Sequence, residues 1–257
     1  MQFIGNPLGL WTLFVRETRR FLNVKMQTIV APALTALLYL LVFHYAMGAR
    51  KVPGLDVDYF SFLAPGLAMM AMLQNAFANT SSSMITAKVM GVHVYLLMAP
   101  LSAAEIVIAF VAAACVRALI VALAFLAPLA PFVHWSASHL GLALLYGLIG
   151  SVLMGAWGLL AGIWARRFDD MAVVTNFVVM PLTFLSGVFY TTAQLPAWAA
   201  AVNRANPFFY LIDGFRFGLL GVADGAPFAA WAPLALLALA SCAAAWHAWR
   251  IGWRIKA

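Results

Sequence analysis

Five long stretches of this chain contain no Asp, Glu, Lys or Arg, and they limit what the chain can fold into. They cover residues 26–49, 59–87, 118–165, 171–203 and 225–249. About 20 apolar residues in a helix cross the hydrocarbon core of a bilayer. The chain is 65% hydrophobic and 9% charged, whereas roughly 25% of the residues of a soluble domain are charged. We therefore expect an all-α, polytopic membrane protein.

The charge-free stretches predict six transmembrane helices. The third stretch is too long for one helix, and residues 128–139 divide it with two prolines and a tryptophan. The predicted spans lie at about 27–48, 59–80, 105–128, 140–163, 171–190 and 228–249. An even number of spans places both termini on the same side of the membrane.

The basic residues are distributed unevenly between the two predicted sides. The side of the termini carries Arg16, Arg19, Arg20, Lys25, Lys88, Arg166, Arg167, Arg250, Arg254 and Lys256, and the other side carries Arg50, Lys51, Arg204 and Arg216. Cytoplasmic loops are enriched in Lys and Arg, so both termini are predicted to be cytoplasmic. The net charge of +7 is thus explained by topology, and no nucleic acid is expected as a partner.

A basic amphipathic leader precedes the first span. Asn6 and Pro7 are typical of a helix start, Asn as the cap and Pro in the first turn. Over about 7–23, apolar side chains recur at helical spacing, and basic side chains such as Arg20 occupy the other face. The pattern predicts an interface helix. Glu17 lies at the seam of the two faces, where it either pairs with an Arg of the leader or helps to dock a cytoplasmic partner.

The segment between spans 2 and 3 is too long for a tight turn and too apolar for a free loop. It predicts a short helix over about 82–94, capped by the serines at 81–83. The apolar side chains expected to face the cytoplasm are Met84, Val89, Met90 and Val94. A partner protein could cover them, or the helix could fold against the membrane face of its own chain.

The segment 190–227 is too aromatic for a soluble loop, and its prolines and glycines interrupt it too often for a span. It predicts re-entrant half-helices over about 190–220 that enter and leave the outer leaflet on one side. Asn206 and Pro207 would start the second half-helix, and Tyr210 suits the interfacial aromatic belt. Asp213 and Arg216 lie three residues apart, so they share a helix face and can pair. We interpret them as a clamp at the extracellular gate.

Arg117 is predicted to lie near the middle of span 3. An Arg at this depth is costly unless it is paired or faces water. Two interpretations stay open: a clamp inside the helix bundle, and a contact with the headgroup of an anionic substrate. In span 4, Gly158 and Gly162 form a small-xxx-small pattern that predicts close packing of two helices.

Four segments together resemble a known family. They are DYFSFLAPGLAMM (58–70), LLMAPLSAAEIVIA (96–109), MPLTFLSGVFYTTAQLPAW (180–198) and NPFFYLIDGFRFGLLG (206–221). In this order and at these positions they resemble the membrane subunit of ABC-2-type ATP-binding-cassette transporters, most closely the small bacterial permeases with a separate ATPase subunit. The resemblance covers essentially the whole chain and implies a multi-pass protein of the bacterial inner membrane.

The resemblance implies a homodimer that binds two cytoplasmic ATPase subunits, surrounded by membrane lipid, and export of an amphipathic or lipid-linked substrate. The leader would be the family's interface helix, residues 82–94 its coupling helix, and residues 190–220 its re-entrant roof. Spans 1, 2 and 5 would line the substrate path. Candidates for ATPase coupling are Glu17, Arg20, Ser82, Met84, Lys88, Gly91 and His93, and candidates for the path are Tyr39, Phe43, Phe177, Met180 and Phe184.

The chain contains no G-x-x-x-x-G-K-[ST] motif, which cradles nucleotide phosphates. We therefore expect no cofactor and no catalysis in this chain, with ATP and Mg bound by the partner subunit. An intramembrane hydrolase is a rival interpretation, but it needs a Ser–His, paired-Asp or HExxH arrangement. A secondary transporter is another, but it typically carries mid-membrane carboxylates and internal repeats. The sequence offers no such carboxylate at mid-span.

Overall fold

The structure is a computed structural model that describes residues 5–47, 50–133, 135–136 and 139–255. Within these ranges the chain folds into helices and turns without a β-strand, which confirms the all-α prediction. The longer helices are α1 (Pro7–Leu22), α2 (Ala31–Met47), α3 (Tyr59–Val89), α5 (Ala103–Leu126), α6 (Leu140–Trp164), α10 (Pro207–Leu220) and α11 (Pro227–Ile251). The shorter ones are η1 (Met26–Val30), α4 (His93–Met98), η2 (Ala127–Leu129), α7 (Phe168–Val174), η4 (Thr175–Val179), α8 (Met180–Phe184), η5 (Thr192–Gln194) and α9 (Ala197–Ala205).

Five helices in the described part of the chain are long and apolar enough to cross a membrane. They are Met26–Phe43, Tyr59–Val89, Ala103–Leu129, Leu140–Trp164 and Pro227–Ile251. The remaining predicted span, 171–190, coincides with a helical run from Phe168 to Phe184 that passes through α7, the π-helical η4 and α8. This run is shorter than the ~20 residues that usually cross the hydrocarbon core, so the sixth span remains a prediction.

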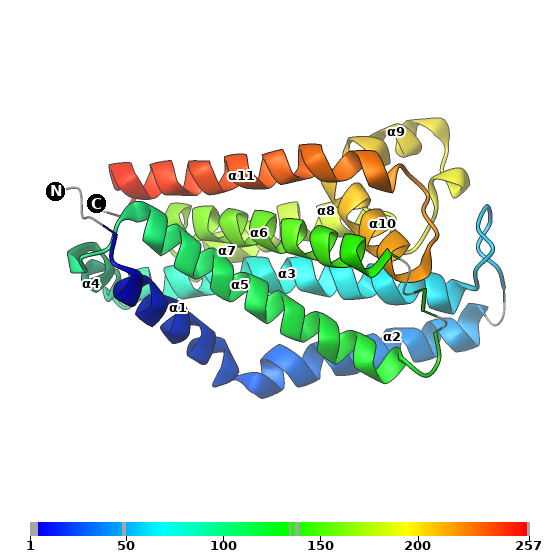
Figure 1. Cartoon of the computed structure of the whole chain (residues 1–257), viewed down its shortest axis with the longest axis horizontal. Helices are drawn as coiled ribbons and strands as arrows, with labels where there is room; N and C mark the ends of the chain where they lie inside the picture. The colour runs from blue at the N-terminus through cyan, green and yellow to red at the C-terminus, as the bar shows by residue number, and fades with distance from the viewer. Residues whose placement is uncertain (1–4, 48–49, 134, 137–138, 256–257) are drawn as a thin grey trace.

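Helix α3 is the centre of the bundle. Its 31 residues pack against α5 and α6 along their lengths, and α10 and α2 contact it as well. Figure 1 shows α3, α6 and α11 running lengthwise, with α11 beside α6 and α5 crossing obliquely. The small residues of α6 allow the close approach: a Cβ on Gly158 would lie 2.3 Å from the Phe77 carbonyl oxygen, and one on Gly162 would lie 2.6 Å from the Met84 Cβ. The predicted close packing through Gly158 and Gly162 is confirmed.

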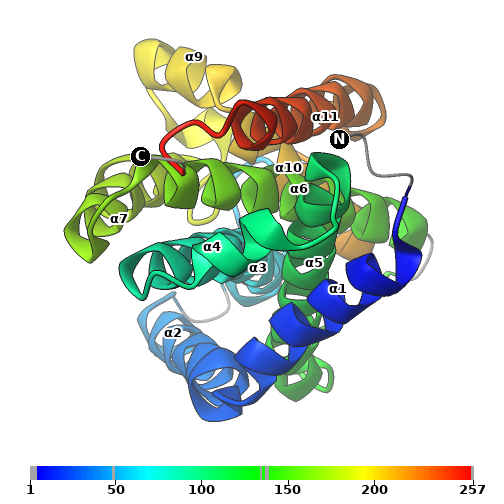
Figure 2. The same ribbon diagram turned by 90° about the vertical axis from the view of Figure 1, so that its left-hand side faces the viewer.

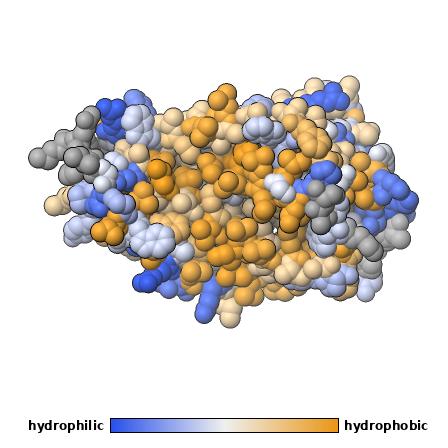
Figure 3. Space-filling view, viewed as in Figure 1, coloured by the Kyte–Doolittle hydropathy of each residue, from blue (hydrophilic) through white to orange (hydrophobic). Residues whose placement is uncertain are grey.

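The bundle has two polar ends and an apolar middle. Helix α4 and the end of α11 lie at one end, which we call the leader end because α1 begins there (Figures 1 and 2). Helices α9 and α10 and the turn at 50–58 lie at the other, which we call the clamp end (Figure 1). On the face seen in Figure 3, hydrophobic residues form a broad band between the two more hydrophilic ends. Such a band is typical of a surface that faces lipid.

The predicted boundary between span 2 and the short helix after it is wrong. Helix α3 continues to Val89, so the serines at 81–83 lie inside it and cap no new helix. Met84, predicted to face the cytoplasm, is fully buried. The chain turns only at Gly91, whose φ of +72° is accessible to glycine at little cost. The short helix that follows is α4, beginning at His93.

Candidate functional site

Glu17 fixes the leader helix to the centre of the bundle. Its carboxylate is buried and accepts hydrogen bonds from the Arg16 Nη2 at 2.8 Å, the Arg20 Nε at 3.2 Å and the Ser83 Oγ at 2.6 Å. The predicted Glu–Arg pair within the leader is therefore confirmed. The hydrogen bond from Ser83 shows that Glu17 also links α1 directly to α3, which the sequence did not reveal.

Arg20 extends this link. Its Nη2 donates to the Asn79 carbonyl oxygen at 2.6 Å, and its Nη1 lies 3.4 Å from the Ser82 Oγ. We call Glu17, Arg20, Asn79, Ser82 and Ser83 the leader network. Three of its five members, Glu17, Arg20 and Ser82, are predicted coupling residues. They meet where α1 contacts α3, with Glu17 buried and Arg20 and Ser82 partly exposed.

The face that α1 turns toward the bundle differs from the expected one. Its buried residues are Leu13, Glu17 and Phe21, each one turn from the next. Trp11, an aromatic side chain of this amphipathic helix, is 61% exposed, and its ring centroid lies 5.4 Å from that of Phe14. The contact stripe follows the predicted seam because the buried Glu17 finds polar partners on α3.

An apolar surface is exposed where the chain turns from α3 into α4. We call it the docking surface, and it consists of Val89, Met90, Val92, Val94, Tyr95 and Met98, which are 44–76% exposed. It surrounds Gly91, where a Cβ would meet nothing within 4 Å. Contiguous exposed apolar side chains at a polar end of a protein are typical of an interaction site. The structure thus moves the predicted docking segment from 82–94 to 89–98.

Lys88 holds the base of the docking surface. Its Nζ donates to the carbonyl oxygens of Ile163 at 2.6 Å and Ala165 at 2.5 Å. These acceptors lie at the end of α6, where carbonyl groups lack partners within the helix. His93, the first residue of α4, is half-buried close to the same place. Both predicted coupling residues therefore contact or approach the end of α6.

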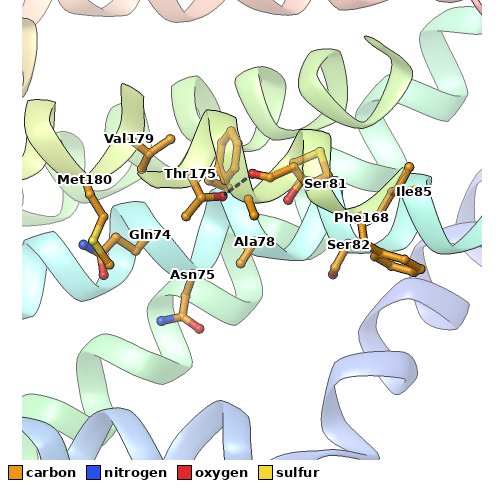
Figure 4. A pocket seen from close by; sticks show the side chains of 13 residues that line it. Gln74, Asn75, Ala78, Ser81, Ser82, Ile85, Phe168, Thr175, Val179 and Met180 are labelled. Atoms are coloured by element: carbon orange, nitrogen blue, oxygen red, sulfur yellow. Dashed lines mark hydrogen bonds between the residues drawn. The ribbon is translucent and has the colours of Figure 1, made fainter. Parts of the chain in front are cut away.

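A mostly apolar groove that contains a few polar side chains lies between α3 and the helical run 168–184 (Figure 4). Its volume is about 360 Å³. The residues that line it are Gln74, Asn75, Phe77, Ala78, Ser81, Ser82, Ile85, Phe168, Met171, Ala172, Thr175, Val179 and Met180. Gln74 donates to the Thr183 Oγ1 at 3.3 Å, which connects α3 to α8. Met180 is the one predicted path residue that lines this groove.

The other predicted path residues are distributed along two helical segments. Phe43 on α2 and Phe184 on α8 both contact Phe189, with ring centroids 5.8 Å apart in each pair. Tyr39 is 37% exposed and Phe177 is 77% exposed. The structure therefore joins Phe43 and Phe184 through Phe189, and it leaves Tyr39 and Phe177 on the outer surface of the subunit.

Arg117 contacts a neutral partner. Its Nε and Nη2 donate to the Asn75 Oδ1 at 3.2 Å and 2.9 Å, which links α5 to α3. Asn75 in turn donates to the Ala71 carbonyl oxygen at 3.0 Å and lines the groove. This contact is of the kind expected for a clamp in the bundle. Asn75 therefore connects the Arg117 guanidinium to the groove, which Arg117 itself does not line.

At the clamp end, Arg216 is fully buried among backbone carbonyls. Its Nη2 donates to the Gly187 oxygen at 2.7 Å and its Nε to the Phe62 oxygen at 3.3 Å. Its guanidinium carbon lies 3.7 Å from the centroid of the Phe62 ring, a cation–π contact. Its Nη1 lies 3.5 Å from the Asp213 Oδ1, which confirms the predicted pairing. Arg216 therefore joins α10 to α3 and to the loop after α8.

Asp213 holds the other side of α10. Its carboxylate accepts hydrogen bonds from the backbone N–H groups of Asp224 at 2.9 Å and Gly225 at 2.8 Å. Asp224 accepts the Thr192 hydroxyl at 2.8 Å. Asp213 thus ties α10 to the turn before α11, and Asp224 ties that turn to the segment before α9. We call Asp213, Arg216, Asp224, Gly187 and Phe62 the clamp.

Asn206 and Pro207 begin α10 as predicted. The Asn206 Oδ1 accepts the Phe208 N–H at 3.0 Å, and its Nδ2 donates to the Leu182 oxygen at 2.8 Å, so the cap also holds α8. Tyr210 is half-buried, with its ring 5.1 Å from that of Phe209. The predicted short helices are present as α9 and α10.

Sequence reasoning missed the acceptors and donors on α3. Two of them, Asn79 and Ser83, contact α1. The other three contact one helix each: Gln74 contacts α8, Asn75 contacts α5 and Thr80 contacts α6. A signal was available, because polar side chains within an apolar span usually face partners inside the bundle. What the sequence could not supply was the partner of each one.

A comparison with known proteins identifies the family of this helical chain. Residues 9–220 match the family of ABC-2 type transporters. The chain belongs to this family. It is 35% identical over 217 residues to the inner membrane transport permease YadH of Escherichia coli (strain K12), which covers 84% of this chain and 85% of the relative. YadH of Shigella flexneri is equally similar.

As an ABC-2 family member, the chain is a transport permease of the bacterial inner membrane and crosses that membrane several times. Membership also implies association with ATPase subunits of the ATP-binding-cassette class. The sequence-based recognition of this family is confirmed.

Proposed function

We propose that this chain is the permease subunit of an ABC exporter, with the leader end in the cytoplasm. One observation carries the proposal: the exposed docking surface lies at one end of α3, and the clamp grips the other end. Helix α3 runs between them as a single helix of 31 residues. A push on α4 by an ATPase would therefore reach the clamp through one rigid element.

Two copies of the chain would form the path. Each copy leaves the apolar side chains of α2 exposed, including Leu34, Leu38 and Leu41 at 55–56%. The groove between α3 and the run 168–184 is mostly apolar, and its polar side chains are Gln74, Asn75, Ser81, Ser82 and Thr175. Polar groups set in an apolar groove suit an amphipathic or lipid-linked substrate, whose polar part needs hydrogen-bonding groups within the membrane. ATP and Mg would be bound by the two ATPase subunits.

The docking surface can be tested by removing its two most exposed side chains, Tyr95 and Met98. We expect the double variant Tyr95→Ala/Met98→Ala to copurify with at least about tenfold less of its ATPase, because each buried side chain contributes ~1.5–3 kcal/mol. Trp198→Ala is the matched control, since Trp198 is 73% exposed on α9 at the clamp end. Its ATPase yield should equal that of the wild type.

Stimulation of ATP hydrolysis by the reconstituted permease gives the second measurement. The double variant should lose this stimulation and the control should keep it. Equal ATPase yield and equal stimulation in all three proteins would overturn the proposed docking site. Transport by the purified chain on a proton gradient without any ATPase would overturn the proposed function itself.

A further inference from the structure

A small cavity at the leader end is lined by basic side chains. Lys88, His93, Arg166 and Arg254 surround it, and its volume is about 440 Å³. This falls in the ~300–1,000 Å³ range of small-ligand sites. Among the described residues, no carboxylate lines the cavity. The four side chains come from α3, α4, the turn after α6 and the chain after α11, so the fold gathers them from distant parts of the sequence.

Two of the cations are held in place by the end of α6. Lys88 donates to the carbonyl oxygens of Ile163 and Ala165, and the Arg254 Nη1 donates to that of Trp164 at 3.0 Å. These bonds complete the helix end and orient both side chains before any ligand arrives. A guanidinium has five donors, so Arg254 retains several for a ligand.

The neighbouring groups leave the cavity positive. The nearest acid, Asp170, accepts the backbone N–H groups of Arg166 at 2.8 Å and Arg167 at 3.1 Å, and these bonds lower the pKa of its carboxyl group. Asp170 is thus ionised at neutral pH, and its single negative charge offsets only one of the positive charges of Lys88, Arg166 and Arg254. His93 can form a hydrogen bond with a ligand, because its Nδ1 is buried and has no hydrogen-bond partner.

The aromatic neighbours indicate the depth of the cavity in the membrane. The Arg254 guanidinium lies 5.6 Å from the Trp164 ring and 5.7 Å from the Trp253 ring. Trp164 is the last residue of a helix that can span the membrane. Trp side chains at span ends lie at the level of the lipid headgroups, and basic cavities between spans at that level recognise anionic headgroups. A soluble partner would have to enter the headgroup layer to reach it.

We propose that this cavity binds the phosphate group of an anionic phospholipid. Arg166 and Arg254 supply charged donors of the geometry that phosphate prefers, and His93 supplies a donor or acceptor at its unpaired nitrogen. The bound lipid would stabilise the docking surface, because Lys88 precedes Val89 and His93 lies between Val92 and Val94 of that surface.

The test compares lipid retention by purified protein in nanodiscs of phosphatidylcholine with and without phosphatidylglycerol. Native mass spectrometry counts the phospholipids that remain after stepwise delipidation. A Lys or Arg beside an anionic headgroup contributes ~1 kcal/mol to binding, or about fivefold, so Arg166→Gln should reduce retained phosphatidylglycerol by about that factor. The matched control is Arg167→Gln, which removes the same charge from the next residue, outside the cavity; its loss should be clearly smaller, because Arg167 does not line the site.

A second variant and a second ligand sharpen the result. Arg254→Lys keeps the charge but loses the guanidinium fork, and it should retain less phosphatidylglycerol than the control while keeping the wild-type melting temperature within a few degrees. Equal losses in Arg166→Gln and Arg167→Gln would overturn the proposal, since only overall charge would then matter. Stabilisation of the wild type by inorganic phosphate, without any preference for phosphatidylglycerol, would also overturn it. Retention that depends on the ATPase being present would assign the cavity to the partner protein.

Discussion

Asp213 and Arg216 lie 3.5 Å apart, yet each makes its shortest contacts with different parts of the backbone. Arg216 holds the carbonyl groups of Phe62 and Gly187, and Asp213 holds the N–H groups of Asp224 and Gly225. Each charge therefore satisfies polar groups that would otherwise be buried without partners. A buried ion pair by itself adds little stability, so the value of this one lies in joining three segments at the clamp.

Breaking this pair from one side should be costly. We expect Arg216→Met to lower the free energy of unfolding by about 3–5 kcal/mol, because it leaves a buried carboxylate without its cation. The measurement is chemical unfolding in detergent, carried through a cycle with Asp213→Asn and the double variant. The two sites are in contact, so their effects should deviate from additivity by roughly 0.5–3 kcal/mol.

Arg204→Met is the control for the clamp variants. Arg204 is exposed near the end of α9, and a surface change of this kind shifts stability by at most about 0.5 kcal/mol. Additive effects of the two clamp variants, or equal losses in Arg216→Met and Arg204→Met, would show that the two charges do not act together.

At the scale of elements, α3 determines how the other helices are placed. Its apolar side chains pack in the core, and its polar residues contact four neighbouring helices: α1, α5, α6 and α8. Interhelical hydrogen bonds and small residues are what associate helices in lipid, where the hydrophobic effect between them is absent. The contact between α3 and α6 uses both, through the Thr80 hydroxyl on the Gly155 oxygen at 2.8 Å and through Gly158.

A methyl group at Gly158 should force α3 and α6 apart. The added Cβ would lie 2.3 Å from the Phe77 carbonyl oxygen, which is backbone and cannot rotate away. We expect Gly158→Ala to lower the free energy of unfolding by about 1–3 kcal/mol, the usual cost of overpacking. Gly141→Ala, on the same helix with nothing within 4 Å, should be neutral or slightly stabilising. Similar melting temperatures for the two variants would contradict the close contact.

At the scale of the whole molecule, the ends differ in composition and in contacts. The leader end carries the docking surface and the cationic cavity. The clamp end carries short helices tied to one another through Asp213 and Asn206. This polarity matches a permease that receives energy at one end and opens at the other.

The orientation can be measured directly by cysteine labelling in intact cells. Lys51 lies in the turn at the clamp end and Arg167 lies at the leader end, and both side chains are exposed. An impermeant maleimide should label Lys51→Cys in intact cells and Arg167→Cys only after permeabilisation. The wild type gives the baseline, since Cys115 and Cys242 are half-buried within α5 and α11. The reverse labelling pattern would place the docking surface outside the cell and overturn the proposed function.

Much of the site was predictable in kind but not in position. The pairs of Glu17 with an Arg and of Asp213 with Arg216 follow from helical spacing, which is local. The coupling segment was predicted to begin at 82, about two helical turns before the docking surface, because Ser81–Ser83 look like caps in the sequence. In the structure those serines are satisfied inside α3, where Ser83 binds Glu17 from 66 residues away.

The sequence by itself determined the class of the protein: long apolar stretches, sparse charge and ordered motifs specify a helical membrane permease, because lipid allows few ways to satisfy a backbone. Only the tertiary structure decided where α3 ends, which carbonyls Arg216 holds and how Lys88, His93, Arg166 and Arg254 come to surround one cavity. These are contacts between residues far apart in the chain. Their geometry depends on how whole helices pack, and no local pattern encodes it.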